Sequence, residues 1–296
     1  MRILLIGKNG QLGWELERAL ATLGPVRAVD LPEIDLAQPK TLTPLVRETH
    51  PDLIVNAAAY TAVDRAETEE DLARMVNGVA PGALAEEAAR LGAAFIHYST
   101  DYVFDGRKTT PYTEADAPHP LNAYGRTKLE GERAVEAAGG AYLILRTSWV
   151  YSLRGAGFVN KVLSWLRMQD EVRVAEDEVS SPTWARALAQ ATAQILAAAG
   201  HLVVPRLKEQ RGVYHLAGAG AASRLEWARE IAACDPHPEE HKAKGIEPAR
   251  RADFPSAAAR PAYSVLDCSR ARDTWGVKLP PWREALREAM EAMGTR

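Results

Sequence analysis

The chain has 296 residues, of which 47% are hydrophobic and 25% charged, an ordinary balance for a globular enzyme with a substantial core. Its formal net charge of −3 creates no overall field that favours nucleic acid or an anionic membrane, so we expect neither as a partner. The two cysteines exclude a disulfide framework. The N-terminal apolar run is too short for a signal peptide or a membrane span, and a cytoplasmic protein is predicted.

Short apolar runs alternate with helical patterns through the first half of the chain. Strands buried on both faces are predicted over residues 3–6, 26–29, 53–55, 94–97 and 142–145. Helices are predicted over residues 11–23, 71–91 and 122–136. This alternation indicates an α/β fold with a doubly wound parallel sheet of the Rossmann type.

The second half has a looser rhythm. Helices are predicted there over residues 157–167, 184–198, 224–233 and 281–293. We therefore expect an NAD(P)-binding Rossmann domain over residues 1–150 and a mainly substrate-binding domain over residues 151–296. The second domain is expected to be interleaved with late strands of the sheet.

A glycine-rich turn follows the first predicted strand. Gly7, Gly10 and Gly13 have the spacing G-x-x-G-x-x-G, and Gln11 and Leu12 begin the helix that follows. Glycines at this position permit a tight turn and a close approach of the backbone to a pyrophosphate, which the free N–H groups of the helix N-terminus bind. The turn therefore predicts a dinucleotide site.

Asp30 ends the second predicted strand. A carboxylate at this place accepts hydrogen bonds from the adenosine ribose, which favours NADH over NADPH. Asp35 and Leu36 lie just beyond it, where we expect the adenine ring to pack. Arg27 lies on the strand itself, so both NADH and NADPH stay open.

A hydroxyl and a Tyr-x-x-x-Lys pair form the predicted catalytic group. Thr100 follows the fourth strand, and Tyr124 and Lys128 share one face of the next helix. We expect the Lys128 ammonium to lower the pKa of the Tyr124 phenol and bring proton transfer into a usable range. The Thr100 hydroxyl is expected to hold a substrate carbonyl.

Longer motifs surround these residues, at positions 7–16, 55–64, 97–104, 146–151 and 181–183, and at Arg260-Pro261 with Ser264 and Leu266. Taken together, the sequence resembles the dTDP-4-dehydrorhamnose reductases, which are extended short-chain dehydrogenases/reductases, over nearly its whole length. The resemblance implies reduction of dTDP-4-dehydro-L-rhamnose to dTDP-L-rhamnose by NADPH or NADH, in dTDP-rhamnose and cell-surface polysaccharide biosynthesis.

The resemblance also implies roles for individual residues. Thr100, Tyr124 and Lys128 are implied as catalytic. The cofactor is implied to contact Gly10, Gln11, Leu12, Asp30, Ala58, Ala59, Tyr60, Tyr124 and Lys128. The sugar nucleotide is implied to contact Thr100, Asp101 and Trp149. We further assign its diphosphate to Arg260 and the nearby Arg250 and Arg251.

One position departs from the family pattern. The resemblance implies a magnesium-bridged dimer, and Glu15, one of the acidic residues of such a site, is present. Arg186, however, stands where those dimers carry a glutamate, and a cation cannot replace a carboxylate ligand. His237 and His241 have no third ligand nearby. No metal site is therefore predicted, and the chain is expected to be a monomer or a homodimer.

Three other functions are known for proteins of this type. A sugar-nucleotide dehydratase needs an Asp-Glu pair after the threonine, whereas Asp101 is followed by Tyr102. A non-catalytic regulatory subunit on the same fold has no need of the catalytic trio, which this chain keeps. Reduction of another deoxysugar ketone stays open.

Overall fold

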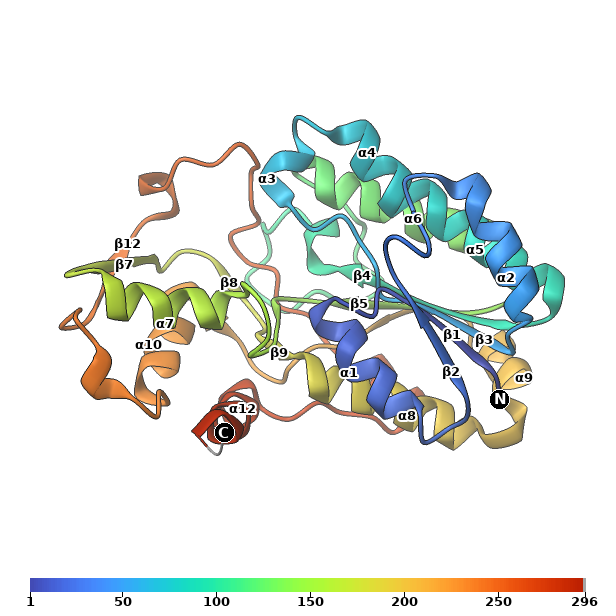
Figure 1. The fold of residues 1–296 in the computed structure, drawn as a ribbon. Coiled ribbons are helices and arrows are strands. Elements are labelled where there is room, and N and C mark those ends of the chain that lie inside the picture. The colour runs from blue at the N-terminus through green and yellow to red at the C-terminus, as the bar shows by residue number, and fades with distance from the viewer. Residues whose placement is uncertain (295–296) are drawn as a thin grey trace.

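A computed structural model describes residues 1–294 of the chain. Its centre is a parallel sheet in the order β10-β5-β4-β3-β1-β2, which confirms the predicted doubly wound fold (Figure 1). The strands are β1 (Ile3–Ile6), β2 (Val26–Val29), β3 (Leu53–Asn56), β4 (Ala94–Thr100), β5 (Ala141–Thr147) and β10 (Gly212–His215). The predicted strands are all present, and the sequence analysis missed β10.

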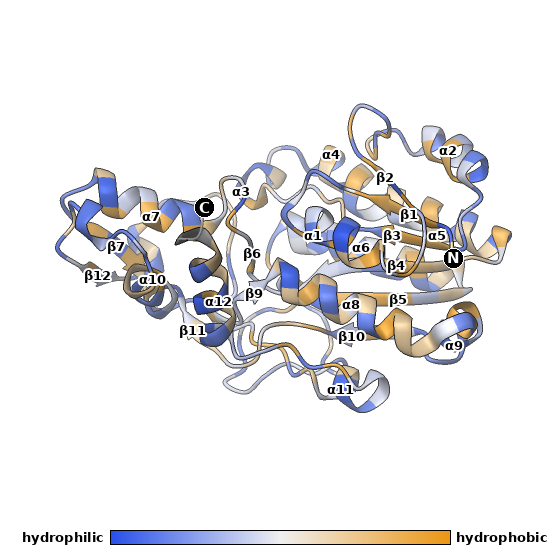
Figure 2. Ribbon diagram, turned by 60° about the horizontal axis from the view of Figure 1, so that its bottom comes forward, coloured by the Kyte–Doolittle hydropathy of each residue, from blue (hydrophilic) through white to orange (hydrophobic). Residues whose placement is uncertain are grey.

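Side chains of each central strand enter a hydrophobic core on both faces of the sheet. In β1, Ile3 and Leu5 pack on one face, and Leu4 and Ile6 pack on the other. The first face is covered by α1 (Gln11–Leu20), α8 (Ala185–Ala199) and α9 (Val203–Glu209), and the second by α2 (Leu42–Thr49), α5 (Ala80–Leu91) and α6 (Ala123–Ala138). Figure 2 shows the hydrophobic strands between helices whose outer surfaces are polar.

The prediction of one uninterrupted α-helix over residues 71–91 is wrong, because a π-helical turn interrupts it. The structure has α4 (Glu70–Arg74), a π-helical turn η2 (Met75–Val79) and then α5. The buried Asn77 side chain leaves this turn to bond the backbone of Tyr60 and the hydroxyl of Thr127. On α6, a Cβ at Gly131 would lie 2.1 Å from the Asn77 carbonyl oxygen, so the two helices cross closely. π-helical turns inside α-helices are frequent at functional sites.

A smaller lobe lies beyond the carboxyl ends of the central strands (Figure 1). It contains α7 (Phe158–Met168) and α10 (Arg224–Ala233), with β7 (Val172–Ala175) paired to β12 (Ile246–Ala249). The remaining elements are β6 (Val150–Tyr151), β8 (Val179–Ser180), β9 (Thr183–Trp184), β11 (Ala222–Ser223), α3 (Val63–Ala66), α11 (Ser269–Trp275), α12 (Trp282–Gly294) and several short 3₁₀ turns. The four helices predicted in this half are confirmed, with ends within one residue.

One helical stretch of the described chain, Ala185–Glu209, is long and apolar enough to span a membrane. Half of its most apolar window (50%) is buried inside the fold, where α8 packs against α1. Core helices of soluble proteins have the same length and composition, and here the apolar residues of α8 belong to the core beneath the sheet.

Candidate active site

A cavity of about 780 Å³ opens at the carboxyl ends of β1, β3, β4 and β5. Ligands of doubly wound sheets bind at this edge. The cavity is lined by the glycine turn, by residues from the ends of the central strands, by Tyr124 and Lys128 of α6, and by the segment that follows β5. It therefore brings together residues that lie as far apart in the chain as Gly7 and Gly157.

The glycine turn forms one wall of the cavity. Gly7, Gly10, Gln11 and Leu12 line it, and no side chain caps the N-terminus of α1. Gly13 lies behind this wall, where a Cβ would come within 1.8 Å of the Gly7 carbonyl oxygen. Gly7 has a positive φ of 94°, which favours glycine. The turn thus offers uncapped N–H groups and close backbone access, as a bound pyrophosphate requires.

Of the three residues predicted to hold the adenosine end of the cofactor, only Asp30 lies at the cavity. Asp30 lines the cavity and accepts hydrogen bonds from the backbone N–H groups of Asn9 at 3.0 Å and Leu31 at 2.9 Å. Asp35 instead accepts from the N–H of Ala37, and Leu36 is buried in the core. Neither is part of the cavity wall.

The loop after β3 contributes Ala58 and Ala59 to the cavity, but not Tyr60. The Tyr60 hydroxyl donates to Glu69, and its backbone N–H and carbonyl are both bonded by Asn77, at 2.8 and 3.0 Å. Tyr60 therefore anchors the loop, while its neighbours face the cavity.

The three predicted catalytic residues all line the cavity. Thr100 ends β4, and its hydroxyl donates to Asp101 at 3.1 Å and accepts from the N–H of Tyr102. Tyr124 lies in the first turn of α6, which the side chain of Asn122 caps. The start of that helix sits on the Tyr102 backbone, since a Cβ at Gly125 would lie 2.2 Å from the Tyr102 carbonyl oxygen.

The expected lowering of the Tyr124 pKa is wrong. Burial raises the pKa of this phenol above its ordinary value, and a hydrogen bond with Thr100 offsets only part of that effect. The Lys128 amine points to β4, where Nζ donates to the Tyr98 carbonyl oxygen at 2.7 Å and lies 3.1 Å from His97 Nε2. Burial lowers the pKa of Lys128 to about 8.

Asp101 is the centre of a buried hydroxyl cluster at the cavity wall. It accepts from Thr100, from Ser180 at 3.0 Å and from Ser264 at 2.5 Å. Burial raises its pKa to about 6, against the opposing effect of these hydrogen bonds. Asp101 thereby connects the Thr100 hydroxyl to Ser180 and Ser264, which lie in two segments of the second half of the chain.

Trp149 closes the far end of the cavity. Its φ of 41° is unusual for a bulky residue, and such strained residues cluster at ligand sites. The ring stacks on Trp227 with centroids 5.6 Å apart, and the Arg224 guanidinium lies 3.5 Å from its centre. The sequence analysis missed Arg224, because nothing in the order of residues relates the start of α10 to the end of β5.

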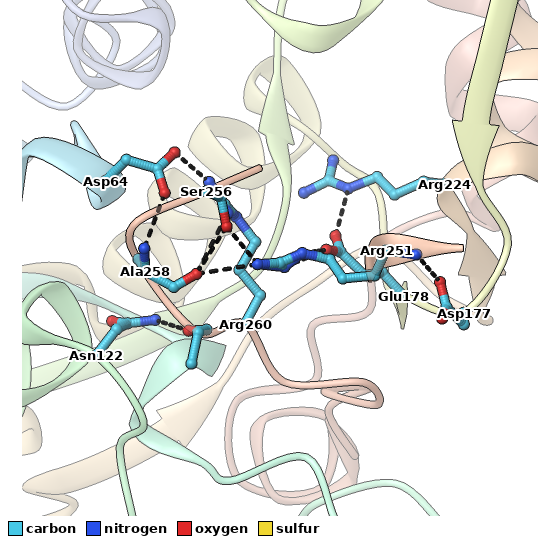
Figure 3. Close-up of polar contacts among 10 residues, drawn as sticks. Asp64, Asn122, Asp177, Glu178, Arg224, Arg251, Ser256, Ala258 and Arg260 are labelled. Carbon is cyan, nitrogen blue, oxygen red and sulfur yellow. Dashed lines mark hydrogen bonds and ion pairs between the residues drawn. The ribbon is translucent and has the colours of Figure 1, made fainter. Parts of the chain in front are cut away.

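The arginines predicted to hold a diphosphate are not part of the cavity wall. They are engaged with carboxylates, and Figure 3 shows Arg260 with Asp64 and Arg251 with Glu178. Arg260 donates to Asp64 at 2.6 Å. Glu178 is shared by Arg251, at 2.9 Å, and Arg224, at 3.6 Å. Arg250 pairs with Glu176 near the surface. Arg224, which shares Glu178 with Arg251, stacks on Trp149 of the cavity wall.

Arg154 is a second missed residue. It lines the cavity beside the start of α1, and its guanidinium lies 3.4 Å from the centre of the Trp14 ring. Arg18 stacks on the same ring at 3.2 Å. Gln11 Oε1 accepts from the N–H of Ser152 at 2.9 Å and so ties the Arg154 loop to α1. In the sequence, the glycine-rich run Arg154-Gly155-Ala156-Gly157 was the feature that could have indicated a ligand-binding loop there.

Glu15 does not fit a magnesium site. Its carboxylate is paired with Arg186 at 3.3 Å, so a cationic side chain occupies the position next to the oxygens that a metal would need. Within residues 1–294, the one group of three close histidine or acidic ligands is His237, Glu239 and Glu240, all exposed on a surface turn.

The chain is similar to known proteins over nearly its whole length. The family model described as RmlD substrate binding domain matches residues 1–295. The dTDP-4-dehydrorhamnose reductase of Burkholderia thailandensis is 43% identical over 295 residues, which cover 97% of each chain. The solved dTDP-4-dehydrorhamnose reductase of Clostridium acetobutylicum is 34% identical, with a TM-score of 0.90 over 99% of this chain and 100% of its own.

A further solved dTDP-4-dehydrorhamnose reductase, from Bacillus anthracis, was determined in complex with NADP. It is 31% identical and has a TM-score of 0.86 over 98% of this chain and 99% of its own. The family match over residues 1–295 includes every residue that lines the cavity.

Proposed function

Because the chain belongs to the RmlD substrate binding domain family, we propose that it reduces dTDP-4-dehydro-L-rhamnose to dTDP-L-rhamnose with NADPH or NADH. This reaction serves dTDP-rhamnose formation for cell-surface polysaccharides. One observation carries the proposal: Thr100, Tyr124 and Lys128 line the same cavity as the uncapped glycine turn. A proton donor and a dinucleotide cradle thus face one space.

Tyr124 donates a proton to the C4 oxygen of the sugar as that oxygen gains charge. The raised pKa keeps the phenol protonated near neutral pH, which is the form that a proton donor needs. The Thr100 hydroxyl, which in the free protein donates to Asp101 at 3.1 Å, turns its proton to the same carbonyl oxygen when the sugar binds. Lys128 binds the nicotinamide ribose.

Residues of the first half hold the cofactor, whose bound nicotinamide supplies the hydride. Gly7, Gly10, Gln11 and Leu12 carry the pyrophosphate at the start of α1, and Asp30 accepts from the adenosine ribose. Arg154 lines the same cavity beside the start of α1 and would supply a positive charge to these phosphates. Because the Asp30 carboxylate repels a 2′-phosphate, NADH is expected to bind at least as well as NADPH.

The sugar nucleotide occupies the end of the cavity next to Trp149 and Asp101. Arg224, beside the Trp149 ring, replaces Arg260 as the arginine proposed to face the diphosphate. We place the protein in the cytoplasm as a monomer or homodimer, with no nucleic acid or membrane partner.

The test is a reduction assay with purified protein. The loss of reduced-nicotinamide absorbance is followed with dTDP-4-dehydro-L-rhamnose, with each cofactor in turn, and the product is identified by mass and NMR. dTDP-glucose, which has no ketone, is the control. Cofactor binding without any oxidation in the presence of the keto sugar would rule the proposal out.

A further inference from the structure

A buried chain of polar groups runs behind the cavity, from the backbone after β3 to the catalytic lysine. It consists of the Ala58 N–H, Asn56, His97 and Lys128, and the three side chains are at most 1% exposed. The reduction mechanism proposed above uses only its last member.

The hydrogen bonds of this chain have a direction that one backbone group determines. The Ala58 N–H can only donate, and it donates to Asn56 Oδ1 at 3.2 Å. The Asn56 amide nitrogen therefore faces His97 Nδ1, at 3.3 Å, and must donate to it. Consequently Nδ1 carries no proton, and the neutral imidazole carries its proton on Nε2.

The Nε2 proton points at Lys128 Nζ, which lies 3.1 Å away. An ammonium has three donors and no lone pair, so a charged Lys128 would set two donors against each other. A neutral amine accepts from Nε2–H and still donates to the Tyr98 carbonyl oxygen at 2.7 Å. Only the neutral amine satisfies every bond of the chain.

We propose that His97 is a positioning residue that sets the protonation state of Lys128: in the cofactor-free protein it donates Nε2–H to an uncharged Lys128 amine, and Asn56 holds the imidazole in that tautomer. The meaning of this arrangement for catalysis rests on the proposed reductase function, because Lys128 is there the ligand of the nicotinamide ribose.

The other groups around Lys128 do not provide an alternative partner. Glu132 lies one turn further along α6 and favours the charged amine, but its carboxylate is bonded by Arg146 of β5, at 2.6 Å, and by Ser99. Tyr124, one turn earlier, is a neutral phenol. Burial lowers the pKa of both His97 and Lys128, in the direction that the hydrogen bonds require.

Two substitutions alter the chain at different points. Asn56→Asp keeps the shape but offers only acceptors, so His97 protonates Nδ1 and its Nε2 accepts from a Lys128 ammonium. His97→Gln keeps a polar group near Nε2 but leaves Asn56 no means of orienting it, so the glutamine oxygen turns to the ammonium. Both changes should raise the pKa of Lys128, by about one unit or more.

The measurement is an NMR titration of the cofactor-free protein labelled with ¹³C at lysine Cε, with the Lys128 signal assigned by Lys128→Met. Thr192→Val is the matched control, since it removes a buried hydrogen bond to Tyr98 and does not touch the chain. We expect wild type and control to titrate together, below the ordinary lysine value, and both test variants to titrate higher. In the reductase assay, the limb of kcat against pH that reports Lys128 should move in the same direction.

A wild-type Lys128 that titrates at the ordinary lysine value would overturn the proposal. A rise in Asn56→Asp alone would also overturn it, because the added charge by itself produces that result. If His97→Gln does not fold, Asn56→Gln replaces it, since the longer amide loses the same contact without adding charge. The titration needs no turnover, so its failure and the failure of the reductase assay are separate results.

Discussion

Burial holds Tyr124 as a neutral phenol, because its effect on the pKa outweighs the opposing effect of the hydrogen bond with Thr100. Tyr124→Phe removes the acidic proton and little else, so we expect kcat to fall by about 10²–10⁴-fold while the Kd for NADPH stays near the wild-type value. Steady-state kinetics and fluorescence titration of the cofactor measure the two quantities. Retention of more than about a tenth of the wild-type rate would assign the proton donor to another group.

The buried Lys128 amine makes the free energy of unfolding depend on pH in the alkaline range. Its pKa is about 8 in the folded protein, below the ordinary 10.5, so folding must neutralise it or bury its charge. This cost is fully present below the folded pKa and disappears as pH rises through the unfolded value. Between about pH 7 and pH 10, wild type should therefore gain about 2–3 kcal/mol relative to Lys128→Met.

Urea unfolding of both proteins across this pH range measures that difference in the free energy of unfolding. The comparison isolates one group, because every other titratable side chain is common to the two proteins. A difference that stays constant with pH would mean that the amine has an ordinary pKa in the folded protein.

At the scale of elements, the π-helical turn η2 joins the cofactor loop to α6 through Asn77. Asn77→Ala leaves the Tyr60 N–H and carbonyl without their partner, which should lower the free energy of unfolding by about 1–3 kcal/mol. Because Ala58 and Ala59 lie on the same loop, cofactor affinity should fall as well. Gln38→Ala, at an exposed turn, is the control. Unchanged cofactor affinity would show that the loop holds its shape without Asn77.

The sequence predicted best what the chain builds locally. The strand 3–6 and the glycine turn after it are neighbours, so one stretch of residues shows both, and the cavity wall at Gly10 and Gln11 was found in this way. The π-helical interruption was not visible, because it depends on Asn77 meeting Tyr60 and α6. Strand β10 was missed because Gly212–His215 holds only two strongly strand-favouring residues.

The contacts of Trp149 and Arg260 also could not be predicted from the sequence. Trp149 was implied by the family resemblance, whereas Arg224 reaches its ring from a helix that begins 75 positions later (224 − 149). Arg260 was assigned to a ligand, but Asp64 of α3 engages it. Pairings between segments so far apart follow from packing and leave no local pattern.

At the scale of the whole molecule, the Glu15–Arg186 pair joins α1 to α8 where a bridging metal would need acidic ligands. We expect EDTA to change neither the sedimentation coefficient nor the catalytic rate, because a guanidinium cannot coordinate magnesium. Arg186→Glu restores a second carboxylate beside Glu15 and should make self-association sensitive to magnesium. A wild-type dimer that dissociates on chelation and re-forms with magnesium would contradict this expectation.

β10 lies at the edge of the sheet and α8 covers one of its faces, and both come late in the chain. This order has a consequence for folding during synthesis. While a ribosome has delivered only the first five strands, the apolar face of the sheet that α8 later covers is still open, and β5 is still an unpaired edge. Both gaps close only when residues 185–215 emerge. A nascent chain halted near residue 150 should therefore bind chaperones and aggregate, whereas one extended past β10 should resist protease across the whole sheet.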